Sequence, residues 1–224
     1  MVKISTYNDI KKSIPSDVLL LAVSKTKPES DIMDFYNLGQ RDFGENHAQE
    51  MTTKHEHLPA DINWHFIGHL QTNKVKYIAP FVFMIHSVDS EKLLAEINKH
   101  AAKNNRTIKC LLQYKVAEEE TKTGFTSDEI IQLFETHVFD QYPNVSINGL
   151  MTVATNTDNE AQIDKEFNQV ADLFSSIKNN YNPPSFTQLS MGMTDDYPIA
   201  IKNHSTIIRI GSAIFGERDY SQKG

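Results

Sequence analysis

The sequence predicts an α/β fold, a single domain over residues 1–224 that closes into a (β/α)8 barrel, also called a TIM barrel. Eight short apolar runs alternate with longer polar segments of helical spacing, which predicts parallel strands with helices outside them. The runs are almost continuously apolar, as expected of strands that are covered on both faces. Eight such units in 224 residues fit the smaller members of this architecture. An open, doubly wound sheet with the same alternation is the alternative.

Each expected strand is an apolar run that stops at polar residues or glycine. The second run, Arg41-Asp42-Phe43-Gly44, is the weakest of them. The runs cover residues 17–24, 41–44, 62–68, 81–88, 107–116, 146–153, 185–191 and 205–211. Apolar residues three and four apart predict the helices, which cover residues 29–38, 46–57, 72–79, 90–103, 127–139, 158–180 and 193–203. Ser90, Ser127 and Asp158 are the expected capping residues of three of these helices.

The charge and composition of the chain argue against some classes of binding partner and indicate the cellular compartment. The chain has 22 basic and 29 acidic residues, a formal net charge of −7, which argues against nucleic acid or an anionic membrane as partner. The single cysteine, Cys110, is expected in the core, and no disulfide can form within the chain. The N-terminus lacks the apolar segment of a signal peptide, and no run of about 18 apolar residues occurs. We therefore expect a cytoplasmic protein.

Two polar patterns have ordinary interpretations. The histidines at 55–57 and the pair His65 and His69 do not complete a set of four metal ligands, so no metal is expected. The acidic run at 117–122 is expected to be a solvated loop after the fifth strand.

The active site of such a barrel lies at the C-terminal ends of its strands, so the polar residues there are the candidates. They include Ser24-Lys25-Thr26-Lys27, Gly44-Glu45-Asn46-His47, His86-Ser87, Met151-Thr152, Ser190-Met191-Gly192 and Arg209-Ile210-Gly211-Ser212. Lys25 stands out because lysine is rarely buried, and it ends a strongly apolar strand. Its amine either reaches solvent or is used chemically.

The loops after the seventh and eighth strands have the composition of an anion site. Ser190 and Gly192 precede a predicted helix, and Gly211 and Ser212 follow the last strand. Glycine lets backbone N–H groups approach a ligand, and these two loops are the usual phosphate site of the fold. Ordinary tight turns would explain the same residues.

A lysine amine beside a phosphate site suggests a ligand that carries both a carbonyl group and a phosphate. A desolvated lysine loses its proton more easily and becomes a nucleophile. Pyridoxal 5′-phosphate (PLP, the vitamin B6 cofactor) and a phosphorylated sugar aldehyde, as in a Schiff-base aldolase, both fit. Arg209 favours PLP, because a guanidinium only donates hydrogen bonds and would leave a pyridine nitrogen unprotonated. Lys27 is the nearest rival of Lys25, although Pro28 argues against it.

Six stretches in order along the chain resemble the pyridoxal phosphate homeostasis proteins, also known as proline synthetase co-transcribed homologues. They are AVSKTKP, FGENHAQE, WHFIGHLQTNK, GLMTVA, LSMGMTDDYPIAI and IIRIGSAIFGERDY. The family is similar to the barrel domain of alanine racemase, so the resemblance implies a barrel of that type. It covers nearly the whole chain.

The resemblance implies a role for each candidate residue. Lys25 would form the internal aldimine with PLP, Asn46 would lie beside the ring, and Arg209 would face the pyridine nitrogen. The phosphate would be held by Ser190, Gly192, Gly211 and Ser212, and Met191 would contact the cofactor. Three positions differ from the usual family pattern: His47, Thr194 and the pair Asn203-His204, where asparagine is expected to tolerate a left-handed turn.

We expect a carrier of PLP rather than an enzyme, with no catalytic residues. In the racemases that this family resembles, an opposing tyrosine comes from a second domain, for which this chain has no room. An unprotonated ring nitrogen also stabilises a carbanion poorly. The expected acceptors are apo-enzymes that use PLP, and the expected state is a monomer. A single-domain amino-acid racemase is the alternative.

Overall fold

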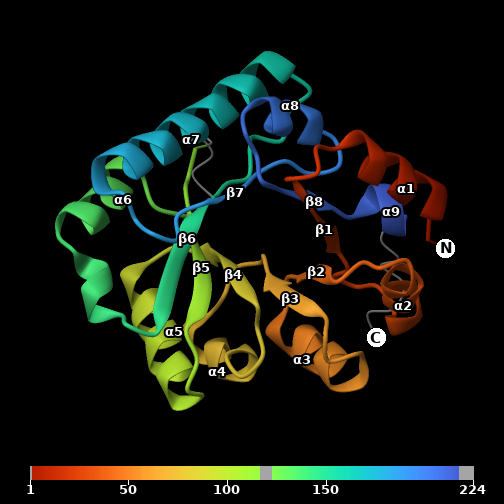
Figure 1. The fold of residues 1–224 in the computed structure, drawn as a ribbon, viewed down its shortest axis with the longest axis horizontal. Helices are drawn as coiled ribbons and strands as arrows, with labels where there is room; N and C mark the ends of the chain where they lie inside the picture. The colour runs from red at the N-terminus through yellow and green to blue at the C-terminus, as the bar shows by residue number, and fades with distance from the viewer. Residues whose placement is uncertain (1, 117–122, 217–224) are drawn as a thin grey trace.

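The computed structural model describes residues 2–116 and 123–216, and it confirms the predicted barrel. The strands pair in chain order, all in parallel, and β8 pairs with β1 to close the barrel (Figure 1). The strands are β1 (Leu19–Val23), β2 (Asp42–Glu45), β3 (Asn63–Phe66), β4 (Met84–Val88), β5 (Ile108–Gln113), β6 (Val145–Met151), β7 (Gln188–Ser190) and β8 (Ile207–Ile210). The open-sheet alternative is therefore wrong, and the weak second run is a strand.

Helices surround this barrel on the outside (Figure 1). They are α1 (Ile4–Ser13), α2 (Glu29–Asn37), α3 (Ala48–His57), α4 (Val75–Ile78), α5 (Glu91–Lys103), α6 (Ser127–Glu135), α7 (Glu160–Tyr181), α8 (Tyr197–Lys202) and α9 (Ser212–Phe215). Short 3₁₀ helices, η1 (Thr72–Lys74) and η2 (Val138–Gln141), lie before α4 and after α6.

The strand period of two divides the core into two parts. Side chains that point outward pack with the helices in one large cluster, in which Cys110 is buried as expected. Side chains that point inward fill the barrel lumen, where the apolar members are Leu21, Met84, Leu111, Met151 and Ile207. Along a strand, residues two apart share a side, so His86 faces the lumen with Met84, and Arg209 faces it with Ile207.

Two helices, α1 and α9, were not predicted from the sequence, and tertiary contacts stabilise them. Helix α1 has no side-chain cap at Lys3, and its Tyr7 packs on Phe35, which in turn packs on Phe215 of α9. The Lys3 N–H donates to the carbonyl of Ile214 at 2.7 Å, which ties α1 to α9. Neither segment has enough periodic apolar residues to predict a helix without those partners.

The capping predictions were right for one helix in three. Ser90 caps α5 by accepting from the Leu93 N–H. Helix α6 is capped by Thr126 rather than Ser127, because Glu129 completes a capping box with Thr126. Helix α7 is capped by Asn159 rather than Asp158.

The structure can also be compared with the predictions for the turn at Asn203-His204, the acidic run, membrane helices and metal ligands. Asn203 has φ −94°, and His204 takes the left-handed turn with φ 66°. The acidic run at 117–122 lies outside the described residues. Within the described ranges, no helix is both long and apolar enough to cross a membrane. In the same ranges, no three histidine, cysteine or acidic residues gather as metal ligands.

Candidate functional site

Lys25 lies in a tight turn at the C-terminal end of β1 and is half-buried. The Ser24 N–H donates to the Gly44 carbonyl at 3.0 Å, and the Lys27 N–H closes the turn onto the Ser24 carbonyl at 3.0 Å. Thr26 has φ 63°, in the left-handed region that β-branched residues rarely adopt. The backbone on the C-terminal side of Lys25 is therefore strained, and something must hold it.

A group of charged and polar side chains, buried except for the partly exposed Glu50, holds this turn, and we name Ser24, Glu45, Glu50 and Lys54 the Lys25 clamp. The Lys54 Nζ donates to the Ser24 carbonyl at 2.9 Å, to Glu45 Oε1 at 2.8 Å and to Glu50 Oε1 at 2.7 Å. The Ser24 hydroxyl donates to Glu45 Oε1 at 2.6 Å. Glu50 Oε1 accepts from the Thr26 N–H at 2.6 Å, so both neighbours of Lys25 are fixed.

Glu45 is the most unusual member of the clamp because it is a carboxyl group whose side chain is 0% exposed. Burial raises the pKa of Glu45 to about 7, against the attraction of Lys54, which lowers it. Its second oxygen, Oε2, is buried with no hydrogen-bond partner in the described part of the chain. A charge on Glu45 is costly to keep in the interior, and the carboxyl therefore takes up a proton near neutral pH.

Lys27, the rival of Lys25, has a different position. Its Nζ donates to the carbonyls of Phe215 and Gly216, both at 3.1 Å. These carbonyls lie at the C-terminal end of α9, where a cation satisfies unpaired acceptors. Lys27 thus ties the β1 turn to the segment after β8.

The loops after β7 and β8 meet beside the end of β1. A Cβ on Gly211 would lie 3.4 Å from the Cβ of Val23, which places Gly211 against the last residue of β1. The Ser212 hydroxyl donates to the Thr194 hydroxyl at 3.3 Å, so the two loops present paired hydroxyls. Gly192 has φ +93°, and a Cβ there would lie 2.6 Å from that of Ala200, so only glycine fits.

Arg209 lies inside the barrel and is only 5% exposed. Its Nη1 donates to the Ser190 carbonyl at 2.8 Å and to the Ser190 hydroxyl oxygen at 2.9 Å, and its Nη2 donates to the Thr152 carbonyl at 2.8 Å. Burial lowers the pKa of Arg209 to about 10, which still leaves it charged at neutral pH. A guanidinium has five N–H donors, and those three bonds leave two without an acceptor among the described residues.

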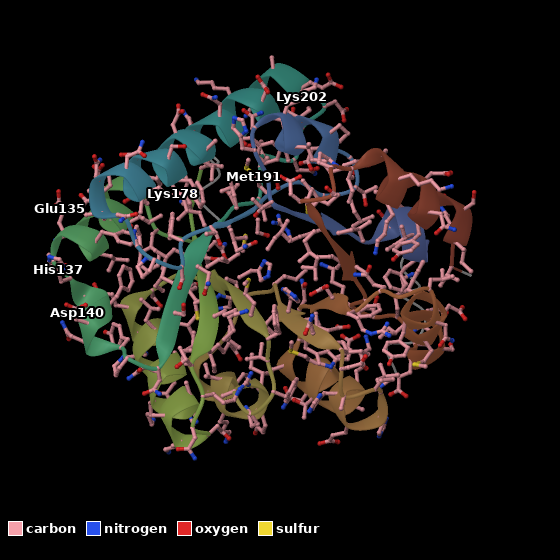
Figure 2. The ribbon with its side chains drawn as sticks, viewed as in Figure 1. Glu135, His137, Asp140, Lys178, Met191 and Lys202 are labelled. Carbon is pink, nitrogen blue, oxygen red and sulfur yellow. The ribbon has the colours of Figure 1, made fainter. Side chains whose placement is uncertain are left out.

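Two of the candidate residues differ from their expected roles. The Ser190 hydroxyl is fully buried, with the Arg209 Nη1 at 2.9 Å and the Nδ1 of His86 at 3.0 Å, so its contacts lie in the barrel interior. The Met191 side chain is 0% exposed and packs in the outer core at the end of β7 (Figure 2). Adjacent residues on a strand face opposite sides, and this alternation turns Met191 away from the lumen.

Asn46 follows β2, next to the end of β1. A Cβ on Gly68 would lie 2.5 Å from the Asn46 carbonyl oxygen, so this close packing requires glycine. The Asn46 Oδ1 is buried without a hydrogen-bond partner in the described ranges. Beside it opens a hollow of about 270 Å³, whose lining includes the exposed His47 and His69 and the half-buried Lys74.

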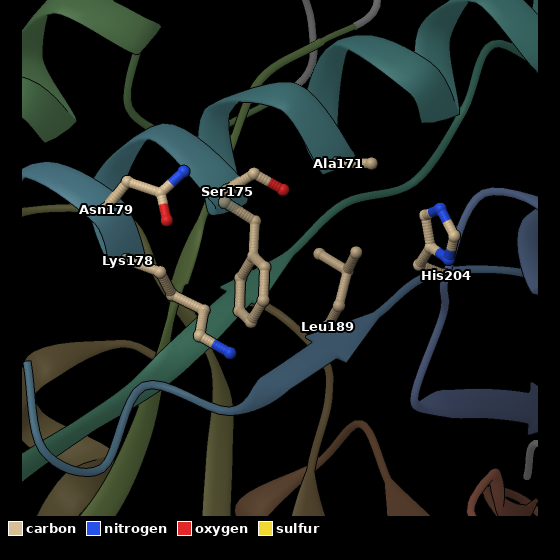
Figure 3. A pocket seen from close by; sticks show the side chains of 7 residues that line it. Ala171, Ser175, Lys178, Asn179, Leu189 and His204 are labelled. Atoms are coloured by element: carbon tan, nitrogen blue, oxygen red, sulfur yellow. The ribbon is translucent and has the colours of Figure 1, made fainter. Parts of the chain in front are cut away.

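A second hollow lies on the outside of the barrel and is separate from these residues. It has a volume of about 250 Å³ and lies between α7 and β7 (Figure 3). Phe174 and Lys178 of α7 line it, with Leu189 and His204 opposite (Figure 3). Because it lies among the outer helices, it takes no part in the site at the strand ends.

The comparisons with known proteins give the family of the chain. The family described as "Alanine racemase, N-terminal domain" matches residues 5–219. A pyridoxal phosphate homeostasis protein of Aquifex aeolicus is 43% identical over 90% of this chain and 87% of its own length. That of Haemophilus influenzae is 38% identical over 98% of this chain and 93% of its own length.

The chain belongs to the pyridoxal phosphate homeostasis protein family.

Solved structures agree with this membership. PipY of Synechococcus elongatus superposes with a TM-score of 0.89 without PLP and 0.86 with PLP bound, at 32% and 31% identity. Each superposition covers 95% of this chain and 99% of PipY. An alanine racemase of Clostridium difficile has a TM-score of 0.79 at 12% identity, over 96% of this chain and 56% of the racemase, which shows a shared fold alone.

Most of the predicted site residues lie at the ends of consecutive strands of the closed barrel. Gly192 follows β7, Arg209 and Gly211 are at the end of β8, Lys25 follows β1 and Asn46 follows β2. Sequence reasoning missed the partners that hold them, namely Lys54, Glu50 and Thr194. Glu45 and His86 were among the candidates because they lie where apolar runs end, but no pattern in the sequence indicated what they contact.

Proposed function

We propose that this protein binds PLP at the ends of β7, β8, β1 and β2 and serves PLP homeostasis as a carrier. The observation that carries the proposal is the gathering of three kinds of group at one end of the barrel. They are the Lys25 turn, the hydroxyl pair of Thr194 and Ser212, and Arg209 with unused donors. PLP has an aldehyde, a phosphate and a ring nitrogen, so each group has a counterpart. The PLP-bound structure of PipY supports the same ligand.

Two details of the site favour a ligand of this kind. The buried Asn46 Oδ1 needs a hydrogen-bond donor, because an unpaired buried acceptor costs free energy. The close approach of Gly192 to Ala200 leaves the backbone after β7 uncovered by any side chain at that position, which suits an anion held by N–H groups. Gly192, Gly211, Ser212 and Thr194 are the phosphate ligands that we propose.

In this proposal Lys25 holds PLP covalently. Its amine condenses with the PLP aldehyde, which forms a C=N bond and releases water. The Lys25 clamp fixes the backbone on both sides of the lysine. The contacts of Lys27 with the α9 carbonyls favour Lys25 as the attachment point.

Arg209 favours holding PLP over turning over amino acids. A charged guanidinium can donate to the ring nitrogen but cannot accept its proton. An unprotonated ring stabilises negative charge on a bound amino acid poorly, and amino-acid chemistry on PLP depends on that stabilisation. We propose PLP-dependent apo-enzymes as acceptors of the carried cofactor and a monomer as the carrier.

A spectrum of the protein with PLP, taken before and after borohydride reduction, tests the proposal. We expect the yellow absorbance of a Schiff base, and mass mapping of the reduced protein should find the label on Lys25. Lys25→Ala should lose both signals and keep its fold, while Lys27→Ala and Lys74→Ala should keep the label on Lys25. A label on another lysine would contradict the attachment point.

Steady-state assays with a panel of L-amino acids separate the carrier from a racemase. We expect turnover far below the ordinary enzyme range of about 1–1000 per second. Racemisation within that range would replace the carrier by the single-domain racemase.

A further inference from the structure

Four buried polar side chains and the partly exposed Asp42 form a continuous hydrogen-bonded chain across the barrel lumen, and we name them the lumen chain: Arg209, Ser190, His86, His65 and Asp42. The Arg209 Nη1 is 2.9 Å from Ser190 Oγ, which is 3.0 Å from His86 Nδ1. The His86 Nε2 is 2.8 Å from His65 Nδ1, and the His65 Nε2 is 3.1 Å from Asp42 Oδ1. Ser190 and both histidines are 0% exposed.

One arrangement of protons, with both histidines neutral, gives every hydrogen bond of this chain a donor and an acceptor and leaves no hydroxyl proton unused. Arginine only donates, so the Ser190 oxygen accepts from Arg209, and in this arrangement the Ser190 O–H donates to His86 Nδ1. His86 then carries its proton on Nε2 and donates to His65, which donates from Nε2 to the Asp42 carboxylate. Both histidines are neutral, and every bond points from the cation toward the anion.

The surroundings favour this neutral, directed arrangement. Burial lowers the pKa of His86 well below its ordinary value, and His65 and Arg209 act in the same direction. The Asp42 carboxylate is also held by the Asn63 side-chain amide at 3.1 Å. Hydrogen bonds in such a chain polarise one another, so the anion at one end strengthens the acceptor at the other.

The lumen chain places polar side chains among apolar ones inside the barrel. The neighbouring inward positions are apolar, including Leu21, Met84 and Ile207, so the barrel is able to pack without polar groups there. Replacing a buried polar network by apolar side chains is often neutral or stabilising. Stability alone therefore gives a weak reason for two buried histidines, whereas their connection to Arg209 gives a specific one.

We infer that His86 is a positioning residue for Arg209. By drawing the Ser190 proton toward itself, His86 keeps the Ser190 oxygen turned to the guanidinium, and His65 and Asp42 hold His86 in the required tautomer. Arg209 is then fixed with its two remaining donors available for the ring nitrogen of PLP. This inference rests on the proposed function, since it specifies how that site recognises the ring.

Affinity for two ligands tests the inference: PLP and its 1-deaza analogue, in which C–H replaces the ring nitrogen. Both have the aldehyde and the phosphate, but only PLP accepts from Arg209. We expect His86→Leu to weaken PLP binding about tenfold and to change binding of the analogue by less than about twofold. In His86→Asn, the side-chain oxygen replaces Nδ1 as acceptor, so most of the PLP affinity should return.

His55→Leu is the matched control, because His55 stacks on Phe81 in the outer layer and belongs to neither the clamp nor the lumen chain. It should change neither affinity. If His86→Leu does not fold, Ser190→Ala takes its place and should give the same selective loss for PLP. The urea midpoint of each variant checks its fold.

Equal losses for the two ligands would overturn the inference, because they would show that the chain supports the fold alone. Unchanged affinity for both ligands would overturn it as well. A wild-type protein that forms no reducible adduct with PLP would instead contradict the proposed function, so the two failures are distinguishable.

Discussion

The Lys25 clamp holds the backbone beside Lys25, and the lumen chain holds the side chain of Arg209. The two groups use different kinds of interaction. The clamp gathers Lys54 with Glu45 and Glu50 around the turn, so full charges meet at distances below 3 Å. The lumen chain keeps its charges at its two ends, on Arg209 and Asp42, and joins them through neutral hydroxyl and imidazole groups. One is an ionic cluster and the other is a row of aligned dipoles.

The difference predicts which side of the site responds to pH. The pKa of Glu45 is raised to about 7, so the clamp titrates near neutrality. The pKa of His86 is lowered well below its ordinary value, so His86 does not titrate there. Changes near neutral pH should therefore act on the Lys25 turn, through Glu45, and not through His86.

The largest expected effect comes from breaking the clamp. At pH 8, where Glu45 of the wild type is ionised, Lys54→Met leaves this carboxylate buried without its counter-ion, and removing one partner of a buried ion pair costs up to about 3–5 kcal/mol. Urea unfolding measures the loss. Lys99→Met is the control, because Lys99 is 55% exposed and its pair with Glu96 should contribute about 0.5 kcal/mol or less. Similar losses in the two variants would show that the clamp is no stronger than a surface pair.

The second effect is the pH dependence of the clamp. The folded state raises the pKa of Glu45 from 4.5 to about 7, so it holds this proton more tightly than the unfolded chain. The resulting stabilisation is complete below the unfolded pKa and is lost as pH rises through about 7. It should amount to roughly 1–3 kcal/mol between pH 5 and pH 8.

Glu45→Gln tests this dependence, because glutamine cannot titrate. The variant should lack the share of the wild-type difference in unfolding free energy that belongs to Glu45. Glu91→Gln, exposed at the start of α5, should keep the full difference. A wild-type slope that survives in Glu45→Gln would assign the titration to another group.

Alanine variants of two serines separate recognition of the phosphate from recognition of the ring. Ser212→Ala removes a hydroxyl from the proposed phosphate site and should weaken PLP binding roughly tenfold, while pyridoxal, which has no phosphate, binds as before. Ser190→Ala acts through Arg209 at the ring and should weaken both ligands by a similar factor. A loss confined to PLP in Ser190→Ala would return Ser190 to the phosphate site.

The smallest effect is relief of backbone strain beside Lys25. Asparagine adopts the left-handed conformation of residue 26 more readily than threonine, so Thr26→Asn should stabilise the protein by about 0.5–1 kcal/mol. The backbone N–H to Glu50 is kept. Thr53→Asn, on the exposed face of α3, is the control and should change stability little. Destabilisation by Thr26→Asn would mean that the threonine side chain itself supports the turn.

The sequence alone determined the barrel and the end at which the candidate site residues lie. Continuous apolar runs in alternation with helical segments predict parallel strands, and the same periodicity puts Lys25, Asn46, Gly192 and Arg209 at strand ends. The strand ends of a closed barrel converge, so those positions follow from chain order. A cytoplasmic location and a monomeric state stay predictions.

Only the tertiary structure decided what those residues contact. Ser190 meets His86 across 104 residues of chain, and Lys54 reaches Ser24 across 30, which no local pattern encodes. The inward or outward direction of Ser190 and Met191 depended on where β7 pairs with its neighbours. Periodicity sets how a chain folds locally, whereas side-chain hydrogen bonds form between whichever groups the closed barrel brings within about 3 Å.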